Sequence, residues 1–196
     1  MSAVDALTAG EEALAALGPT PFHLPLGPLA PAVAGAFSAM PKGEWVVAGP
    51  RTRVGAVLRG CPPRRLTDPA QGARPYKLAP VSQAPGSRAL HAVGLAMGSG
   101  KPVLCLLGLA SAASGALHEA LNAAVLTGAP VIFVVVRQAL TDDAPVGRQL
   151  AGDLVALAKA HGAQAVSVEA SEDAVHAAVA SARAHAGPTL IEARLG

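Results

Sequence analysis

The sequence predicts an α/β protein with a doubly wound, mostly parallel sheet and a helical N-terminal region. Short β-branched apolar runs alternate with helical stretches, which is the order expected of strand–helix–strand units. The strand runs lack polar alternation, so we expect both of their faces to be buried, as in a parallel sheet. The chain is 52% hydrophobic but only 3% aromatic, which favours small-residue helices packed closely on that sheet.

Two strands with a helix between them are expected in the middle of the chain. The apolar runs 103–107 and 131–136 predict the strands, and the Ala-rich stretch 114–127 predicts the helix. The sequence Gly128-Ala129-Pro130 ends this helix and leads into the second strand.

The C-terminal part predicts two more helix–strand units. Ser171 is a candidate N-cap, and Glu172 and Asp173 would lie in the first turn of the helix that follows, where acidic side chains favour the helix dipole. The elements expected are a helix over 150–161, a strand over 164–168, a helix over 172–185 and a strand over 189–193.

The first part of the chain is less regular. Helical patches at 3–17, 28–40 and 87–98 are separated by Pro/Gly-rich turns, and no low-complexity linker divides them. We therefore expect a single domain over 1–196, with 1–86 as an irregular helical region and 87–196 as the α/β core.

Charge and composition bound the function. Only 14% of residues are charged, which leaves little to cover a monomer, and we expect a homo-oligomer, a dimer above all. The net charge of +2 is small, so nucleic acid is not an expected partner. Residues 1–18 carry three acidic side chains and no uninterrupted apolar run, so neither a signal peptide nor a membrane span is expected. Two cysteines without ligand spacing fit a cytoplasmic protein.

One stretch concentrates basic residues. Its arginines are expected to form a solvated loop face, because that is the usual place of surface charge. They are Arg51, Arg53, Arg59, Arg64 and Arg65.

A motif at the end of the first predicted strand resembles a known family. Residues 108–122, Gly-Leu-Ala-Ser-Ala-Ala-Ser-Gly-Ala-Leu-His-Glu-Ala-Leu-Asn, are similar to the pattern G-D-G-x-x-x-x-G-x-x-H-E-A-L-N. That pattern is typical of the first-component alpha subunit of thiamine-diphosphate-dependent 2-oxoacid dehydrogenases, which act on pyruvate, branched-chain substrates or acetoin. Further landmarks follow in the family's order to the end of the chain, so the resemblance covers about 87–196 and implies a sheet of the thiamine-diphosphate-binding type.

The positions that hold the cofactor in that family are altered here. In active members the acidic residue of G-D-G and an asparagine after the next strand bind Mg²⁺, which prefers hard oxygen ligands. This chain has Leu109 and Arg137 there, with Gln138 next to Arg137, and Ala110 replaces the second glycine. The expected cofactor-site positions, mostly degenerate, are Gly108, Leu109, Ala110, Arg137, Gln138 and the upstream Arg51.

Other residues of the resemblance carry weaker expectations. Arg51 corresponds to the arginine of a Tyr-Arg pair that approaches the diphosphate, but Pro50 stands at the tyrosine position. His118, Glu119 and Asn122 lie on a helix that packs in the subunit core of the family, so a structural role is expected for them.

The resemblance and these departures lead to a functional interpretation with two alternatives. The interpretation is a degenerate alpha-subunit-like protein, a non-catalytic scaffold or regulatory subunit with no catalytic residues, no metal and no cofactor. The first alternative is an alpha subunit of a thiamine-diphosphate-dependent 2-oxoacid dehydrogenase or decarboxylase, active only with a beta-type partner. Its diphosphate site would be metal-free, with Arg137 turned inward beside Arg51. The second alternative is a small-anion binding module in the same crevice.

Overall fold

One parallel sheet organises the structure, a computed structural model that describes residues 2–19, 25–82, 84, 86–137 and 150–195. Its strand order is β1-β2-β3-β5-β4, and every neighbouring pair is parallel. The strands are β1 Val46–Val47, β2 Val103–Gly108, β3 Val131–Arg137, β4 Gln164–Glu169 and β5 Thr189–Arg194. The fold prediction is therefore confirmed, and the four predicted strands are observed with ends shifted by one residue.

The central strands are buried on both faces, as their unbroken apolar runs predict. β2 is buried except at Gly108, and β3 is buried except at Arg137, which is half-buried. The edge strand β4 is different, because most of its residues are partly or fully exposed. The carboxyl ends of β2 and β3 therefore mark the point where the buried interior meets the surface.

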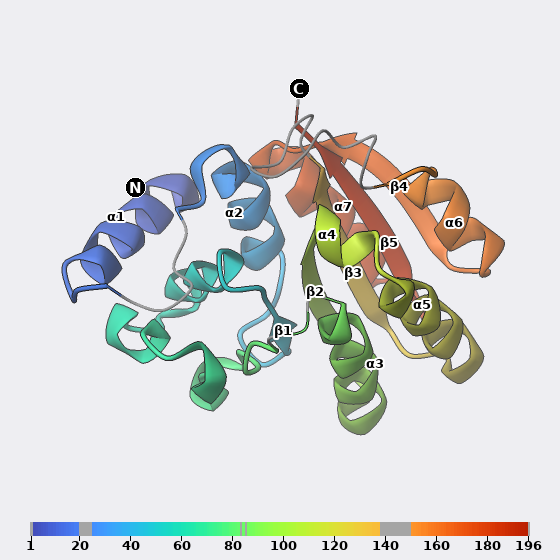
Figure 1. Cartoon of the computed structure of the whole chain (residues 1–196), viewed down its shortest axis with the longest axis horizontal. Helices are drawn as coiled ribbons and strands as arrows, with labels where there is room; N and C mark the ends of the chain where they lie inside the picture. The colour runs from blue at the N-terminus through green and yellow to red at the C-terminus, as the bar shows by residue number, and fades with distance from the viewer. Residues whose placement is uncertain (1, 20–24, 83, 85, 138–149, 196) are drawn as a thin grey trace.

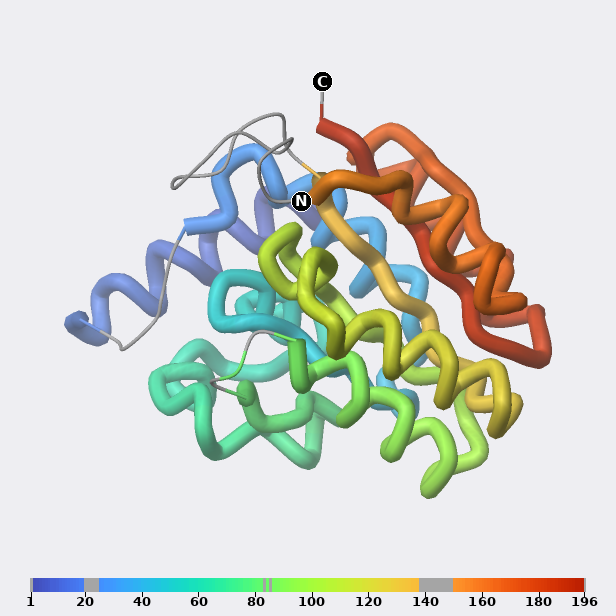
Figure 2. Tube along the Cα trace, turned by 45° about the vertical axis from the view of Figure 1, so that its right-hand side comes forward, coloured from blue at the N-terminus to red at the C-terminus, as the bar shows by residue number. Residues whose placement is uncertain are grey.

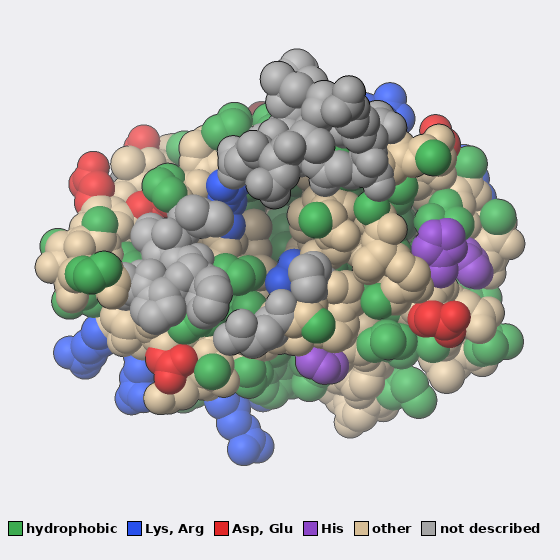
Figure 3. All heavy atoms as spheres, in the orientation of Figure 1, with side chains coloured by type: hydrophobic (Ala, Val, Ile, Leu, Met, Phe, Trp, Pro, Cys, Tyr) green, Lys and Arg blue, Asp and Glu red, His purple; other side chains and the backbone are tan. Residues whose placement is uncertain are grey.

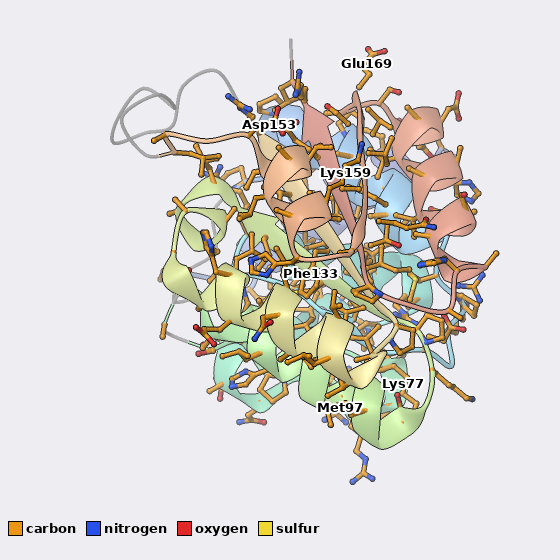
Figure 4. All side chains as sticks on the ribbon, turned by 90° about the vertical axis from the view of Figure 1, so that its right-hand side faces the viewer. Lys77, Met97, Phe133, Asp153, Lys159 and Glu169 are labelled. Carbon is orange, nitrogen blue, oxygen red and sulfur yellow. The ribbon has the colours of Figure 1, made fainter. Side chains whose placement is uncertain are left out.

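Helices cover both faces of the sheet (Figure 1). Helices α3 (Ser87–Ser99), α5 (Gly115–Thr127) and α6 (Leu154–Ala160) pack on one face, against a core that includes Phe133 and Leu190. Figure 4 shows Phe133 in the layer between the sheet and these helices. The opposite face carries α2 (Ala30–Ser38) and α7 (Glu172–Arg183), which pack on each other and on alternate side chains of the same strands.

Two of these helices begin at the side-chain caps that their sequences supply. The Ser171 hydroxyl accepts a hydrogen bond from the backbone N–H of Ala174 at 3.4 Å, as expected for an N-cap. Asp153 accepts from the backbone N–H of Ala156 at 2.8 Å, so α6 begins at Leu154, four residues later than expected from its apolar spacing.

The N-terminal region lies beside the sheet and continues its core (Figure 2). Its elements are α1 Ala3–Ala15, η1 Gly27–Leu29, η2 Thr52–Arg59, η3 Pro63–Leu66, η4 Pro69–Gln71 and η5 Arg74–Tyr76. The region is joined to α7 by an ion pair in which Arg183 donates to Glu44 at 2.9 Å. None of the helices in the described ranges has the length and apolar character needed to cross a bilayer.

Three features differ from the sequence expectation. The short strand β1 was not expected, and neither was α4 (Leu109–Ala112), a single turn that directly follows β2. The prediction that the arginines of this stretch form a solvated loop face is wrong for Arg53 and Arg59, which are only 3% and 4% exposed. Arg59 lies inside because its guanidinium donates to the backbone carbonyls of Pro41 and Glu44.

Candidate functional site

A pocket of about 200 Å³ lies where the short helix η2 meets the carboxyl end of β2. In open α/β sheets, ligands bind in crevices at the carboxyl ends of the strands, so the fold itself points to this place. The pocket is lined by Leu29, Gly49, Pro50, Arg51, Thr52, Arg88, Leu106, Leu107, Gly108, Leu109 and Val136.

The first residue after β2 gives the pocket an apolar wall. Gly108 is the extended N-cap of α4, and it has no side chain to cap the turn. The next residue, Leu109, is only 4% exposed and lines the pocket. The position that a metal-binding carboxylate would occupy in the resembled motif is therefore filled by a buried isobutyl group.

Arg88, in the first turn of α3, supplies a buried cation at the pocket. Its side chain is 7% exposed, and its Nη2 donates to the Ser111 hydroxyl at 2.8 Å. A Cβ added at Gly49 would lie 3.3 Å from Arg88 Cζ, so the guanidinium packs directly on the Gly49 backbone. The Nε atom of Arg88 is buried and has no hydrogen-bond partner among the described residues.

The charge of Arg88 is not balanced by a carboxylate among the described residues, since none forms an ion pair with it. Burial lowers the pKa of Arg88, while the Cys105 sulfur beside it acts in the opposite direction. Burial also raises the pKa of the Cys105 thiol to about 12, so this sulfur is not an anion at neutral pH. The described residues around Arg88 therefore do not supply the negative charge that a buried guanidinium normally has nearby.

Arg51, the N-cap of η2, and Thr52, its first residue, complete the polar side of the pocket. Arg51 is half-buried and lines the pocket. Thr52 accepts a hydrogen bond from the backbone N–H of Gly49 at 3.0 Å, which leaves its hydroxyl hydrogen available to donate.

Arg137 takes a different position from the one hypothesised. It is not among the residues that line the pocket, although its neighbour Val136 is. Its Nη1 donates to Glu192 Oε1 at 2.8 Å, and Arg194 contacts the other carboxylate oxygen at 2.7 Å. Glu192 is fully buried, and its pKa reflects two opposing effects: burial raises it, but hydrogen bonds from Arg137 and Arg194 outweigh burial and hold it below its ordinary value.

The remaining expected site residues are dispersed. Gly108, Leu109 and Arg51 come together at the pocket, whereas Ala110 is exposed on α4. Gln138 lies outside the described residues. The motif residues His118, Glu119 and Asn122 were expected in a core, but they face outward on α5, because Leu117, Ala120 and Leu121 occupy its buried side.

Among the described residues, the two positions where the resembled family holds Mg²⁺ offer no free oxygen ligand. This ion requires oxygen ligands near octahedral geometry, and the two positions provide a buried leucine and an arginine already bonded to Glu192. No group of three His, Cys, Asp or Glu side chains suited to a metal occurs within the described ranges.

The fold and the crevice define the class of this protein. The helix-covered parallel sheet is the fold of solved thiamine-diphosphate-dependent enzymes to which the chain is similar. The family model described as "Dehydrogenase E1 component" matches residues 77–195. The chain belongs to the dehydrogenase E1 component family.

Sequence similarity to curated proteins supports this assignment. The chain is 33% identical over 183 residues to the alpha subunit of 3-methyl-2-oxobutanoate dehydrogenase from Mycobacterium tuberculosis, a match that covers 83% of this chain and 50% of the relative. It thus spans about half the length of the curated relatives it matches.

Solved structures show the same fold at lower identity. Transketolase from Campylobacter jejuni superposes with a TM-score of 0.72 at 15% identity, over 98% of this chain and 37% of that one. The thiamine-diphosphate-dependent 4-hydroxybenzoylformate decarboxylase of Rhodococcus jostii gives a TM-score of 0.55 at 21% identity, over 85% of this chain and 32% of that one.

Sequence reasoning missed Arg88, the buried cation of the pocket. One indication was available: a positive charge in the first turn of a helix opposes the helix dipole, so Arg88 is unfavourable there unless it has another role. Its burial against Gly49 and Ser111 depends on chain segments far apart in sequence, which periodicity does not relate.

Proposed function

We propose that this chain is an alpha-subunit-like member of the dehydrogenase E1 component family that serves as a non-catalytic scaffold or regulatory subunit. One observation carries the proposal: the two positions expected to bind Mg²⁺ hold Leu109, which is buried, and Arg137, which is bonded to Glu192. Without these oxygen ligands, the diphosphate of the cofactor has no metal to bind.

Electrostatics supports the same conclusion. A unit positive charge about 4 Å from a dication opposes binding by roughly 8 kcal/mol at an effective dielectric constant near 20. Glu192 offsets part of this, but it is shared by Arg137 and Arg194, so the formal charge of the three groups is still positive. A metal site at this end of β3 would have to overcome that charge.

The surface of the chain supports association with a second chain. The outward side of the neighbouring helices α3 and α5 carries the exposed apolar residues Leu90, Met97 and Leu126, the last of them 77% exposed. Figure 4 places Met97 near the C-terminal end of α3. Such apolar exposure is typical of a surface that another subunit covers, either a second copy or a beta-type dehydrogenase subunit. The two cysteines are free and buried, which supports a cytoplasmic protein.

A second candidate function is a working alpha subunit that acts only with a beta-type chain. The 33% identity to the alpha subunit of 3-methyl-2-oxobutanoate dehydrogenase favours it. This candidate requires thiamine diphosphate to bind in the altered crevice, and it predicts dehydrogenation of a 2-oxoacid when the two chains are mixed.

A restoration experiment tests the proposal. The triple variant Leu109→Asp, Ala110→Gly and Arg137→Asn places a carboxylate, a small residue and an amide where the resembled motif has them. Calorimetry with thiamine diphosphate and Mg²⁺ should then detect binding to the variant and no Mg²⁺-dependent binding to the unchanged chain.

The variant Arg137→Asn alone is the matched control, because it removes the cation without supplying the carboxylate. We expect it to show no Mg²⁺-dependent binding. Mg²⁺-dependent binding by the unchanged chain, or activity after mixing with a beta-type chain, would overturn the proposal in favour of the second candidate.

A further inference from the structure

One side of the sheet ends in a strand whose outer edge is unpaired. β4 is the last strand in the order of the sheet, and among the described residues it pairs with β5 alone (Figure 1). The backbone N–H of Gln164 points to the β5 side, where it donates to the carbonyl of Pro188 at 3.1 Å. Since these directions alternate along a strand, the N–H and C=O groups of Ala165, Ser167 and Glu169 point away from β5. They are open to another strand.

This edge lacks the features that usually keep an edge strand from pairing, which are prolines, lysines and bulges. Its six residues, Gln164–Glu169, include no proline and no basic residue. Their register with β5 is continuous from Gln164 to Glu169, without a bulge. Val166 exposes 41% of its surface here. A regular, partly apolar edge of this kind is suited to the addition of a further strand.

A groove of about 670 Å³ lies beside this edge, between β4 and α7. Its lining is mainly apolar and includes Val166 and Val168 of the strand and Ala177 and Ala178 of α7. Within the described part of the chain, Lys159 of α6 is the one charged residue that lines it. In the space-filling view, the surface over α6 carries hydrophobic side chains with few charged ones between them (Figure 3). The edge therefore combines open backbone groups with apolar side chains.

We propose that the β4 edge pairs with the same edge of a second copy of this chain, in the antiparallel direction, so that the two sheets become one. A two-fold axis at Ser167 relates the strands, and such a contact closes into a dimer. Val166 then lies opposite Val168 of the second copy, which gives two apolar cross-strand pairs. Ser167 exchanges backbone hydrogen bonds with its counterpart, and Ala165 does so with Glu169 of the second copy.

The charges at the two ends of the edge favour a second copy in this orientation. Lys159 lies at the amino end of β4, where it lines the groove with Gln164, and Glu169 is the last residue of the strand. Figure 4 shows the two side chains apart from each other. Neither forms an ion pair with any residue that the structure describes. Antiparallel pairing brings Glu169 of each copy to the end where Lys159 of the other lies, so opposite charges meet twice.

This inference goes beyond the proposed function, and the two can fail separately. Pairing at β4 requires no cofactor, and it uses a different surface from the exposed apolar residues of α3 and α5. Thiamine-diphosphate binding that depends on Mg²⁺ would overturn the proposed function without affecting the β4 contact. A chain that stays monomeric would overturn the β4 contact without restoring a metal site.

Sedimentation equilibrium of the unchanged chain and of two lysine variants tests the contact. We expect the unchanged chain to be a dimer. Val166→Lys places a charge among the apolar pairs and should raise the dissociation constant of the dimer by about 100-fold or more. Leu126→Lys adds the same charge on the exposed side of α5 and should leave the dimer unchanged. A monomeric unchanged chain, or a dimer that Leu126→Lys dissociates and Val166→Lys does not, would overturn the proposal.

Charge reversal tests the antiparallel orientation and covers the case in which Val166→Lys does not fold. Lys159→Glu and Glu169→Lys should each weaken the dimer by about 10-fold, because opposite charges become like charges at both ends of the pair. The double variant exchanges the two charges and should restore the affinity of the unchanged chain. Weakening that simply adds up in the double variant would contradict the orientation.

A disulfide at the two-fold axis tests the register. Opposite Cα atoms at a hydrogen-bonded antiparallel position are about 5.5 Å apart, within reach of a disulfide. Ser167→Cys should therefore form a covalent dimer on mild oxidation, whereas the natural cysteines are buried. Ser99→Cys, exposed at the end of α3, is the matched control and should stay monomeric on a non-reducing gel. A dimer in solution that Ser167→Cys does not cross-link, or that Ser99→Cys does, would overturn the proposal.

Discussion

The guanidinium of Arg137 at the end of β3 donates to the buried carboxylate of Glu192 on the neighbouring strand β5, at 2.8 Å. Arg194 bonds the other carboxylate oxygen, so Glu192 is held from both sides. The pair lies at the carboxyl edge of the sheet, near Asp153 at the start of α6, which Figure 4 labels. Arg137 is therefore part of the architecture of this edge and is not directed into the pocket.

Glu192→Gln should destabilise the protein by about 2 kcal/mol. The substitution removes a buried carboxylate that accepts charge-assisted hydrogen bonds, while the partly exposed arginines Arg137 and Arg194 can return to water. Urea unfolding at neutral pH measures the loss. No change in the free energy of unfolding would mean that the network contributes nothing.

Acidification should weaken the fold through the same carboxylate. The pKa of Glu192 is lower in the folded chain than its ordinary value, so its stabilisation is complete above the ordinary glutamate pKa of about 4.3. This stabilisation is lost as the pH falls from about 4.3 through the lower pKa that Glu192 has in the folded chain. The urea concentration at the midpoint of unfolding, measured between pH 7 and pH 3, should fall less steeply for Glu192→Gln than for the unchanged chain. The same dependence of this midpoint on pH in both proteins would contradict the assignment to Glu192.

Arg53→Met should stabilise the protein by about 1 to 4 kcal/mol. Arg53 is 3% exposed, and within the part of the chain that the structure describes none of its three guanidinium nitrogens has a hydrogen-bond partner. Burial accordingly lowers its pKa, with smaller opposing effects from Cys61 and Asp68. An apolar side chain of similar length removes the desolvation cost. Thermal unfolding measures the change, and a lower midpoint would show that the guanidinium makes a favourable interaction.

Gly35→Ala should destabilise the protein by about 1 to 3 kcal/mol or more, because α2 and α7 touch at this glycine. A Cβ at Gly35 would lie 2.2 Å from the backbone oxygen of Glu172, which cannot move without shifting α7. Gly43→Ala is the matched control, since a Cβ there meets nothing within 4 Å. Urea unfolding of both variants tests the contact, and equal stabilities would contradict the close packing of the two helices.

Neither cysteine should react in the native protein. Burial raises the pKa of Cys105 to about 12, so only about one thiol in ten thousand is ionised at pH 8, and Cys61 is buried as well with a raised pKa. Alkylation by iodoacetamide, followed by mass spectrometry, should require unfolding by urea. Rapid labelling of Cys105 in the native state would show that the core around β2 opens.

The α/β core could be predicted from the sequence because its signals are local. The apolar runs of β2 and β3, the glycine that ends α5 and the serine that caps α7 each determine structure within a few residues. The prediction of α6 began too early because Leu150 continues the apolar spacing, whereas the cap at Asp153 decides where the helix starts. β1 was missed because two residues are too few for a pattern.

The site was harder to predict because its residues come from separate segments. The motif correctly located Gly108 and Leu109, which line the pocket, but it suggested Arg137 as the cation. Its side chain turns instead to Glu192, a pairing set by the register of β3 and β5. The buried cation is Arg88, which reaches the pocket from α3 and packs on Gly49, and no local pattern connects these positions.

Binding of thiamine diphosphate by the purified chain, measured by calorimetry in Mg²⁺ and again in EDTA, tests the central claim most directly. Because Leu109 and Arg137 provide no ligands for the metal, the heats in the two buffers should be the same, and any affinity should come from the phosphate groups alone. Micromolar binding that appears in Mg²⁺ and disappears in EDTA would show that a metal site forms, and it would contradict the account.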